Sequence, residues 1–398
     1  MQKKTNIPAL RFPEFSEGWE ASKFDEIFLF STGRNIKQNE ASPEFETPCV
    51  RYGELYHMYN EVINKVINKT NLDKAELLFS DGDEILLPSA GEDPLDIGSA
   101  SALTIKNVAI GRTINILKPI KDNVYSQIFA SYYINHRLRK YISQLAKGVS
   151  ISNVYNSDLR TLFIKLPTLP EQTKIAQFLT AIDQKIQALK KKKALLETYK
   201  KGVMQQLFSQ KLRFKPVPNE TSGNQNGNDF ADWEEKKLGE VLESITTKKY
   251  QIKATEFKEK GKYKVIDQGQ DLIAGYSDSE NNVFRNLPII VFGDHTTILK
   301  FIDFDFVVGA DGTKLLKNKF NDNLKYLFFN LEFNNVKQEG YKRHYTMLSE
   351  VFLQLPSLPE QVKIANFLSG LDEKINQTSQ QIAQTEVWKK GLLQKMFV

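Results

Sequence analysis

One long segment of this chain occurs twice, and the repeat restricts the possible folds more than any other feature of the sequence. Leu166-Pro-Thr-Leu-Pro-Glu-Gln172 returns 189 residues later as Leu355-Pro-Ser-Leu-Pro-Glu-Gln361. The match continues without a gap to Phe208 and Phe397, and about half of the paired positions are identical. A repeat of this length predicts two copies of one structural unit.

The repeated segment predicts a long helix in each copy. Pro170 suits the first helical position, and Glu171 places a negative charge in the first turn, where the helix dipole favours it. Apolar side chains then recur at spacings of three, four and seven, which is typical of a coiled-coil seam. These side chains are Ile175, Phe178, Leu179, Ile182, Ile186, Leu189, Leu196, Val203 and Leu207 in the first copy, and Ile364, Phe367, Leu368, Leu371, Ile375, Ile382, Leu392 and Met396 in the second.

Neither helix can bury such an apolar stripe alone. The available partner of matching length is the other copy of the same helix. We therefore expect the two helices to pack as an antiparallel coiled coil with pseudo-two-fold symmetry, holding one globule at each end. Such an arrangement would act as a molecular ruler between the two globules.

The repeat also extends upstream of the helices in a weaker form. Leu10-Arg-Phe12 precedes Trp19 in the first copy, and Leu212-Arg-Phe214 precedes Trp233 in the second. The second copy carries an insert at 215–229 that is rich in Pro, Asn, Gly and Ser, a composition typical of a flexible linker.

The regions between each Trp and each helix, 22–164 and 236–353, do not align with each other. Both contain short apolar runs that predict strands, at 84–88, 109–117, 287–292 and 301–308, and both contain a late helical pattern, at 125–145 and 323–333. The predicted fold class is therefore α+β, with two globular domains and two long helices. The predicted boundaries are 1–165 for the first globule, 166–210 for the first helix, 211–232 for a linker, 233–354 for the second globule and 355–398 for the second helix.

Composition narrows the functional classes. A chain of 398 residues is too long to fold around a single hydrophobic core, so we expect at least two domains. The net charge of +6 permits nucleic-acid binding without requiring it. Cys49 is the one cysteine, and the four histidines are too scattered to predict a zinc site. No stretch has the length and apolarity of a membrane helix or a signal core, so we expect a cytoplasmic protein that does not associate with membranes.

The sequence lacks the common catalytic motifs. It contains no phosphate-binding loop, no dinucleotide fingerprint, no Asn/Asp-Pro-Pro-Tyr/Phe tetrapeptide and no nucleophile elbow. A metal-dependent nuclease could be built from Asp303, Asp305, Asp311 and Lys314, although Asp311-Gly-Thr-Lys314 is also an ordinary turn between strands. We expect no catalytic residue, no metal site and no cofactor bound by this chain.

Several polar loops have the composition needed to contact DNA. Arg and Lys can bind phosphates or guanine edges, and Asn can read adenine edges. The candidates in the first globule are Arg34, Lys37, Arg51, Tyr52, Lys147, Ser150, Ser152 and Asn153. Those in the second globule are Lys248, Lys249, Tyr250, His295, Thr296, Lys342, Arg343, His344 and Tyr345, the last four in a loop that begins at Tyr341. The alternative for each loop is an ordinary solvent-exposed surface.

The doubled Leu-Pro-x-Leu-Pro-Glu-Gln-x-Lys-Ile-Ala-x-Phe-Leu segment, the paired Leu-Arg-Phe and Trp residues, and Arg51-Tyr-Gly-Glu-Leu55 resemble the specificity subunit of type I restriction–modification enzymes. The resemblance covers the whole chain. It implies two target-recognition domains, each reading half of a split double-stranded DNA sequence. It also implies that the helices set the gap and dock two methyltransferase subunits, to which restriction subunits bind.

The resemblance further implies that adenine is methylated on the partner subunit after the base has been flipped out of the duplex. S-adenosylmethionine, and ATP with Mg, would then be bound by the partners. The helix side chains that we expect to contact the methyltransferase subunits are Phe178, Leu179, Phe367 and Leu368.

Two other hypotheses remain at this point. A free-standing nuclease would cut DNA in the presence of a metal ion and would lose this activity in Asp311→Ala. A coiled-coil scaffold for proteins would show no sequence-selective binding to DNA with any combination of subunits. A specificity subunit would change one half-site when one globule is exchanged.

Overall fold

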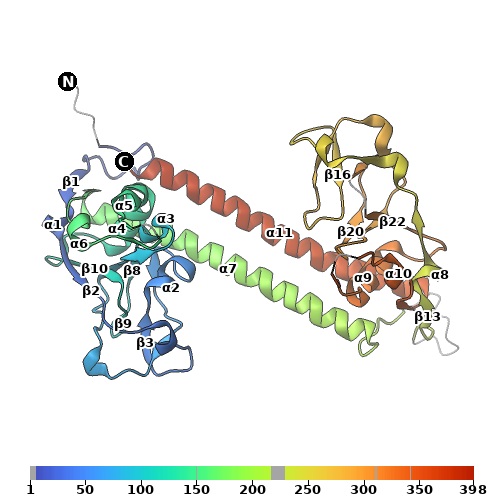
Figure 1. The fold of residues 1–398 in the computed structure, drawn as a ribbon, viewed down its shortest axis with the longest axis horizontal. Coiled ribbons are helices and arrows are strands. Elements are labelled where there is room, and N and C mark those ends of the chain that lie inside the picture. Colours follow the sequence, from blue (N-terminus) through green and yellow to red (C-terminus); the bar gives the residue numbers. More distant parts are fainter. Residues whose placement is uncertain (1–5, 149, 217–228, 310–311, 341) are drawn as a thin grey trace. The chain divides into compact units, whose positions relative to one another are not determined.

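The computed structural model describes residues 6–148, 150–216, 229–309, 312–340 and 342–398. The chain divides into two compact units, each containing one globule and part of both long helices (Figure 1). Unit 1 comprises Met1–Lys190 and Gln380–Val398, and unit 2 comprises Lys191–Ser379. The predicted α+β fold, with two globular domains and two long helices, is confirmed.

The long helices are α7 (Leu169–Phe208) and α11 (Leu358–Met396). Each follows a short strand of its own unit, β12 (Phe163–Leu166) before α7 and β23 (Phe352–Leu355) before α11. The first leucine of each repeated Leu-Pro segment therefore ends a strand. Only the second leucine belongs to a helix.

The start of α7 differs by one position from the prediction. The N–H of Gln172 donates to the carbonyl of Thr168, which makes Leu169 the first helical residue. Pro170 is thus the second helical residue, where its missing N–H is equally harmless because the first turn has no acceptor for it.

Within each unit the two helices run in opposite directions. In unit 1, Lys389 lies 2.7 Å from Asp183, and Glu386 lies 2.7 Å from Lys190. Residue numbers therefore fall along α11 in the direction in which they rise along α7, so the two helices are antiparallel. The buried side chains between them include Ile182 and Ile186 of the predicted seam. The predicted antiparallel packing is confirmed within the unit.

The first globule alternates short strands with short helices. Its elements are β1 (Glu20–Lys23), α1 (Phe24–Ile27), β2 (Phe28–Thr32), β3 (Thr47–Val50), α2 (Tyr52–His57), β4 (Val62–Ile63), β5 (Lys69–Thr70), β6 (Glu84–Pro88), β7 (Ala90–Gly91), α3 (Pro94–Ile97), β8 (Ser101–Leu103), β9 (Ala109–Ile110), β10 (Ile114–Pro119), α4 (Gln127–Tyr133), a π-helical turn (Ile134–Leu138), α5 (Arg139–Leu145), β11 (Ser152–Asn153) and α6 (Asn156–Leu159), with 3₁₀ turns at Gln38–Glu40 and Lys74–Glu76. The main sheet has the order β2-β10-β6-β8-β4. Smaller sheets are β1-β12, β11-β7 and β5-β3-β9.

The second globule follows the same plan. Its elements are β13 (Glu234–Lys237), α8 (Leu238–Val241), β14 (Leu242–Ile245), β15 (Gln251–Ile252), β16 (Tyr263–Ile266), β17 (Gly275–Ser277), β18 (Val283–Phe284), β19 (Ile289–Gly293), β20 (Leu299–Ile302), β21 (Phe306–Gly309), β22 (Thr313–Asn318), α9 (Leu324–Asn334) and α10 (Tyr345–Ser349), with 3₁₀ turns at Lys248–Tyr250, Ala254–Glu256 and Glu280–Asn282. One sheet has the order β14-β22-β19-β20, and another joins β15, β21, β16 and β17, with β18 beside β21. A small sheet pairs β13 with β23.

The two globules share a topology although their sequences do not align. In both globules, the strand that follows the first short helix pairs with the last strand of the main sheet in chain order, β2 with β10 and β14 with β22. The resulting strand orders are β2-β10-β6-β8 in one globule and β14-β22-β19-β20 in the other. A parallel pair lies beside this sheet in each, β3 with β9 and β16 with β21. The repeat therefore covers the globules as well as the helices, which sequence comparison did not show.

Some predicted elements are divided in the structure. The strand predicted at 109–117 is two strands, β9 and β10, with Arg112 in the turn between them. The strand predicted at 301–308 is likewise β20 and β21, and the helix predicted at 125–145 is divided by the π-helical turn. Most of the predicted linker at 215–229 lies outside the described residues.

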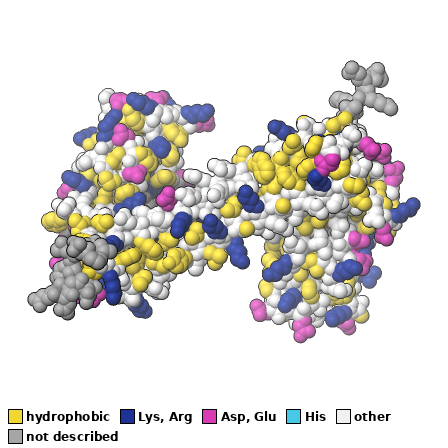
Figure 2. All heavy atoms as spheres, turned by 180° about the vertical axis from the view of Figure 1, so that it is seen from behind, with side chains coloured by type: hydrophobic (Ala, Val, Ile, Leu, Met, Phe, Trp, Pro, Cys, Tyr) yellow, Lys and Arg dark blue, Asp and Glu magenta, His cyan; other side chains and the backbone are white. Residues whose placement is uncertain are grey.

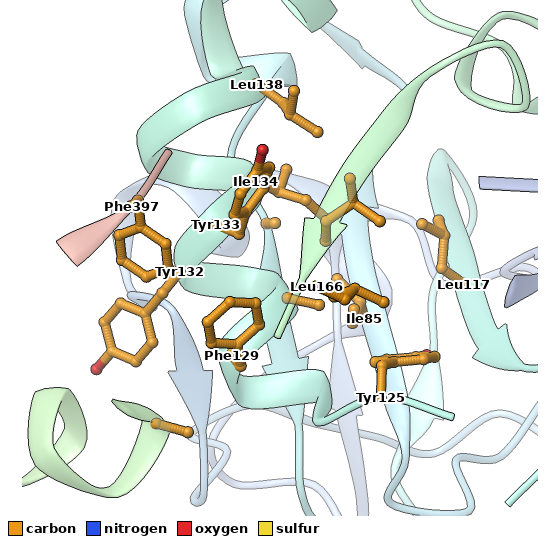
Figure 3. Close-up of a cluster of buried hydrophobic side chains, with 14 of the residues drawn as sticks. Ile85, Leu117, Tyr125, Phe129, Tyr132, Tyr133, Ile134, Leu138, Leu166 and Phe397 are labelled. Carbon is orange, nitrogen blue, oxygen red and sulfur yellow. The ribbon is translucent and has the colours of Figure 1, made fainter. Parts of the chain in front are cut away.

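The repeated tryptophan of the first copy is part of the core of unit 1. Trp19 is 2% exposed, and its ring lies 5.5 Å from that of Phe129 and 6.1 Å from that of Phe397. Figure 3 shows Phe397, at the end of the chain, beside Phe129 and Tyr133 of α4. The end of α11 is thus anchored in the globule by aromatic packing.

Candidate nucleic-acid interface

The repeated Arg and Glu residues form a buried ion pair in each unit. Arg11 donates from Nε and Nη2 to the two carboxylate oxygens of Glu171, at 2.7 and 2.6 Å, and Glu171 has no exposed surface. Arg213 binds Glu360 in unit 2, with its Nη2 2.8 Å from Oε2, and Trp233 Nε1 donates to the same oxygen at 3.1 Å. The Leu-Arg-Phe segment recurs because it neutralises the glutamate at the start of the helix.

The repeated glutamine ties each long helix to a shorter helix of its globule. Gln172 donates from Nε2 to the carbonyl of Pro167 and accepts from the backbone N–H of Ser126, the N-cap of α4. Gln361 makes the equivalent bonds to Pro356 and to Asn323, the N-cap of α9. In unit 1 the globule contributes only a backbone N–H, so this contact does not depend on the globule's side chains, whereas in unit 2 Gln361 Nε2 also donates to the carboxylate of Asp322 at 2.8 Å.

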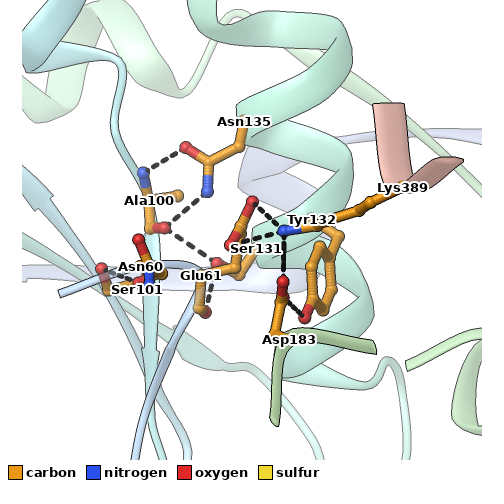
Figure 4. A network of polar contacts seen from close by, with 9 residues as sticks. All are labelled: Asn60, Glu61, Ala100, Ser101, Ser131, Tyr132, Asn135, Asp183 and Lys389. Atoms are coloured by element: carbon orange, nitrogen blue, oxygen red, sulfur yellow. Dashed lines mark hydrogen bonds and ion pairs between the residues drawn. The ribbon is translucent and has the colours of Figure 1, made fainter. Parts of the chain in front are cut away.

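A repeated lysine forms a second contact, here called a joint, between the long helices and the globule, and Figure 4 shows it for unit 1. Lys389 Nζ lies 2.7 Å from Asp183 and 3.3 Å from Glu61, and it is 5.3 Å from the centre of the Tyr132 ring. The hydroxyl of Tyr132 donates to Asp183 at 2.5 Å. Burial, together with the charge of Asp183, raises the pKa of Tyr132, so this hydroxyl remains a donor.

Lys200 makes the equivalent joint in unit 2. Its Nζ lies 2.8 Å from Asp372 and 3.0 Å from Glu332, and it is 5.0 Å from the centre of the Phe329 ring. Burial acts to lower the pKa of Lys200, but Glu332 and Asp372 outweigh it, and the net result is a raised pKa. Lys200 and Lys389 occupy matching repeat positions, as do Asp183 and Asp372, so each copy supplies both partners.

The first globule has a polar cleft of about 460 Å³ at the loop after β2. Three predicted contacts, Lys37, Arg51 and Tyr52, line it. Arg112 lines it as well, from the turn between β9 and β10, and was not predicted to contact DNA. The cleft therefore gathers three cationic side chains around the start of α2.

The second globule has a cleft of about 450 Å³ at the corresponding place in the fold, between the loop after β14 and the turn before β22. Lys248 and Arg343 line it, as predicted contacts that the fold brings together. Lys314 also lines it, and its Nζ is 3.9 Å from the buried carboxylate of Asp294. Cationic groups thus surround both clefts, although the residues that supply them differ.

His344 is placed differently from the prediction. Its side chain has no exposed surface, its Nδ1 lies 3.0 Å from the carbonyl of Asp294, and its Nε2 accepts from the N–H of Glu339. Asp294 Oδ1 also accepts from the N–H groups of His344 and Tyr345. His344 therefore shapes the loop that carries Lys342 and Arg343, and in this conformation it offers no surface to DNA.

The other predicted contacts differ in exposure. The exposed ones are Arg34, Lys37, Tyr52, Lys147, Ser150, Lys248, Lys249, Lys342 and Arg343. Half-buried ones are Arg51, Asn153, Tyr250, His295, Thr296 and Tyr345, and Ser152 is buried. Val149 and Tyr341, which belong to two of the predicted loops, lie outside the described residues. On the face shown in Figure 2, Lys and Arg are scattered among acidic and hydrophobic side chains and do not form one continuous patch.

The predicted partner contacts also separate by exposure. Leu179 and Leu368 are fully buried in the cores of their units. Phe178 is half-buried and packs edge-on against Trp388, with ring centres 6.0 Å apart, while Phe367 is 36% exposed. Trp388 is 50% exposed and was not among the predicted contacts.

Acidic residues gather closely at one place in the described part of the chain, where Asp81, Asp83 and Glu84 could reach a common metal ion. Lys118 already lies there, 2.5 Å from Asp81 and 3.1 Å from Glu84. Glu84 also accepts from three backbone N–H groups. Asp81 and Glu84 are therefore paired with a lysine ammonium and backbone donors, whereas the buried Oδ1 of Asp83 has no hydrogen-bond partner among the described residues.

The residues of the nuclease hypothesis do not form such a group among the described residues. Asp305 pairs with Arg285 at 3.5 Å, and Asp311 lies outside the described residues. Lys314 faces Asp294 in the second cleft. No observation on these side chains favours hydrolysis.

Comparison with known proteins decides the family. A model of the type I restriction modification DNA specificity domain matches residues 16–198 and 231–386, once for each repeat. The chain belongs to this family. It is a specificity subunit of a type I restriction–modification system, and the family is non-catalytic.

Two curated relatives come from Methanocaldococcus jannaschii, the putative type I restriction enzyme MjaX specificity subunit and the MjaVIII specificity subunit. Each is 23% identical to this specificity subunit over 98% of the chain and 95% of the relative. The crystal structure of the S subunit from M. genitalium is similar with a TM-score of 0.69 and 18% identity, covering 98% of this chain and 99% of that one. In the described ranges, no helix combines the length and the apolar composition that a bilayer crossing requires.

Proposed function

We propose that this specificity subunit directs adenine methylation to a bipartite sequence of double-stranded DNA, with each globule reading one half. The observation that carries the proposal is the pair of clefts. They occupy corresponding places in two globules of the same topology, and they are lined by different side chains. Scaffolds that share a strand order but carry different linings are what two unrelated half-sites require.

The proposal assigns the chemistry to partner subunits. Two methyltransferase subunits would bind S-adenosylmethionine, and restriction subunits, where present, would bind ATP with Mg. The specificity subunit would contribute the base contacts and the distance between the half-sites. The two helices, joined to the globules through the repeated Arg–Glu, Gln and Lys contacts, would fix that distance.

The test is to map methylated adenines in host DNA with the gene present and absent. We expect methylation at one split sequence, with a constant gap between its halves, only when the gene is present. An unchanged pattern in a host that also expresses the methyltransferase subunit would contradict the proposal.

We further propose that the methyltransferase subunits bind aromatic side chains of the helix pair that are fully or partly exposed. In unit 1 these are Phe178 and Trp388, supported by Phe12 at 5.7 Å from Phe178. In unit 2 they are Phe367, packed 5.8 Å from Phe214, and Tyr199, which is 53% exposed. Trp388 and Tyr199 occupy matching positions of the repeat, as two copies of one docking site require.

Removing both of these aromatic residues should weaken assembly. The variant Tyr199→Ala with Trp388→Ala is expected to bind methyltransferase subunits at least about tenfold more weakly, because large aromatic residues dominate the binding energy of interfaces. Titration followed by analytical ultracentrifugation measures the effect. The matched control is Leu195→Ala, since Leu195 is 61% exposed on α7 and has the polar Gln384 at its repeat position. Equal binding by the double variant and the control would contradict the proposed docking site.

A further inference from the structure

Arg51 in the first cleft is held by a buried carboxylate. Its Nε donates to Oε1 of Glu54 at 2.9 Å, and its backbone N–H donates to Oε2 of the same residue at 3.3 Å. Glu54 is 2% exposed and accepts a further bond from Asn68 Nδ2 at 2.9 Å. The carboxylate is therefore held by two separate segments of the chain, and it fixes the guanidinium in turn.

Because Arg51 binds Glu54 through Nε, the two Nη groups at the outer edge of its guanidinium are available for another contact. Within the described residues, neither Nη group of Arg51 has a hydrogen-bond or ion-pair partner. The side chain is 22% exposed and lines the cleft together with Lys37, Tyr52 and Arg112. Two donors in one plane thus remain at a recessed, positively charged site, and little side-chain entropy is left to lose on binding.

We propose that Arg51 donates two parallel hydrogen bonds, one from each Nη, to a planar pair of acceptors on DNA, and that Glu54 is the residue that positions it. The acceptor pair is either O6 and N7 of a guanine or two oxygens of one phosphate, since both match the end of a guanidinium. The inference rests on the proposed function of the first globule. It adds which group makes the contact and how that group is oriented.

The second cleft has no equivalent arrangement among its described residues. Arg343 is exposed, and no carboxylate there binds its guanidinium. Lys314 faces Asp294 at 3.9 Å, but an ammonium is a point donor without a planar fork. Among the described residues that line the two clefts, an arginine oriented by a buried carboxylate therefore occurs in the first cleft alone.

The test uses the complete complex with its methyltransferase subunits and a duplex that carries the methylated sequence mapped for the natural chain. Arg51→Lys keeps the charge and loses the fork, and it should weaken binding about ten- to a hundredfold. Arg137→Lys is the matched control, because Arg137 is exposed in the same unit outside the cleft. This control should bind as the natural chain does.

The variant Glu54→Gln tests whether Glu54 positions Arg51 for DNA binding or only supports the fold. If Glu54 acts through Arg51, the substitution weakens binding in the natural chain and has no further effect in the Arg51→Lys variant. If it only supported the fold, binding would fall equally in both backgrounds, and that result would overturn its role as a positioning residue. Thermal unfolding of each variant is measured alongside.

Two modified duplexes identify the acceptor. Replacing a guanine of the first half-site with 7-deazaguanine removes N7, and at one position it should cancel the effect of Arg51→Lys if the acceptor is a base. A single methylphosphonate should do the same if the acceptor is a phosphate. Unchanged affinity and unchanged sequence preference in Arg51→Lys would overturn the inference while leaving the proposed function intact. Failure of the natural complex to prefer its mapped sequence would refute both.

Discussion

Exchanging residues 22–164 for the matching region of another specificity subunit is expected to replace one half of the methylated sequence and to leave the other half unchanged. The structure favours these limits, because Ser22 and Ile164 are paired across β1 and β12. The cut therefore leaves Glu20–Ala21 paired with Lys165–Leu166, and the Arg11–Glu171 pair remains as well. Gln172 needs only a backbone N–H from the new globule, which any sequence can supply.

Methylome mapping of the chimaera measures the result. A change in both half-sites together would contradict independent reading by the two globules. Insertion of whole helical turns within 188–196 of α7, with matching turns in α11, is the control, since it should change the length of the gap and neither half-site. The reciprocal exchange of 236–353 should replace the other half, and there too the limits are cross-strand partners, Lys236 and Leu353.

The long helices could be predicted from the sequence because the same helical pattern occurs in both copies of the repeat. Apolar spacing gave their extent to within a few residues, and matching lengths gave their antiparallel packing. The purpose of the repeated polar residues could not be found in this way. Arg11 and Glu171 are 160 positions apart, and only the folded chain shows that the Leu-Arg-Phe segment neutralises the helix start.

The sequence predicted no cleft, but it identified some of the side chains that line the two clefts. Lys37, Arg51 and Tyr52 were identified from loop composition, and the fold brings them together. Arg112 was missed because its neighbours at 109–117 alternate like one continuous strand, whereas the structure places a turn there between β9 and β10. Thr113 has a positive φ of 67° in that turn, and β-branched residues give no signal for such a conformation.

The shared topology of the two globules lay beyond sequence comparison for a related reason. A buried strand position needs an apolar side chain of about the right volume and not a particular residue, so β6 (Glu84–Pro88) and β19 (Ile289–Gly293) can occupy the same place with little identity. The helices retain identity because each must fit the other copy and an identical set of joints. A divergent lining on a common scaffold is what selection for new half-sites would leave.

Arg11→Ala is expected to destabilise unit 1 by about 3–5 kcal/mol, the cost of leaving a buried carboxylate without its partner. Glu171 has no exposed surface, and both of its oxygens bind Arg11 alone among the described residues. Urea unfolding at neutral pH, with the transition of unit 1 assigned by limited proteolysis, measures the loss. Arg11→Met combined with Glu171→Leu should recover most of it, because removal of both charges leaves nothing unpaired.

Arg213→Ala provides the comparison within the same chain. Arg213 is 24% exposed, against 10% for Arg11, and Glu360 keeps a hydrogen bond from Trp233 when the guanidinium is removed. Its loss of stability should therefore be smaller than that of Arg11→Ala. Equal losses in the two variants would mean that the charge alone matters, whereas a negligible loss in Arg11→Ala would mean that water or a proton replaces the guanidinium at Glu171. The ranking of the two variants thus tests whether burial sets the strength of the repeated joint.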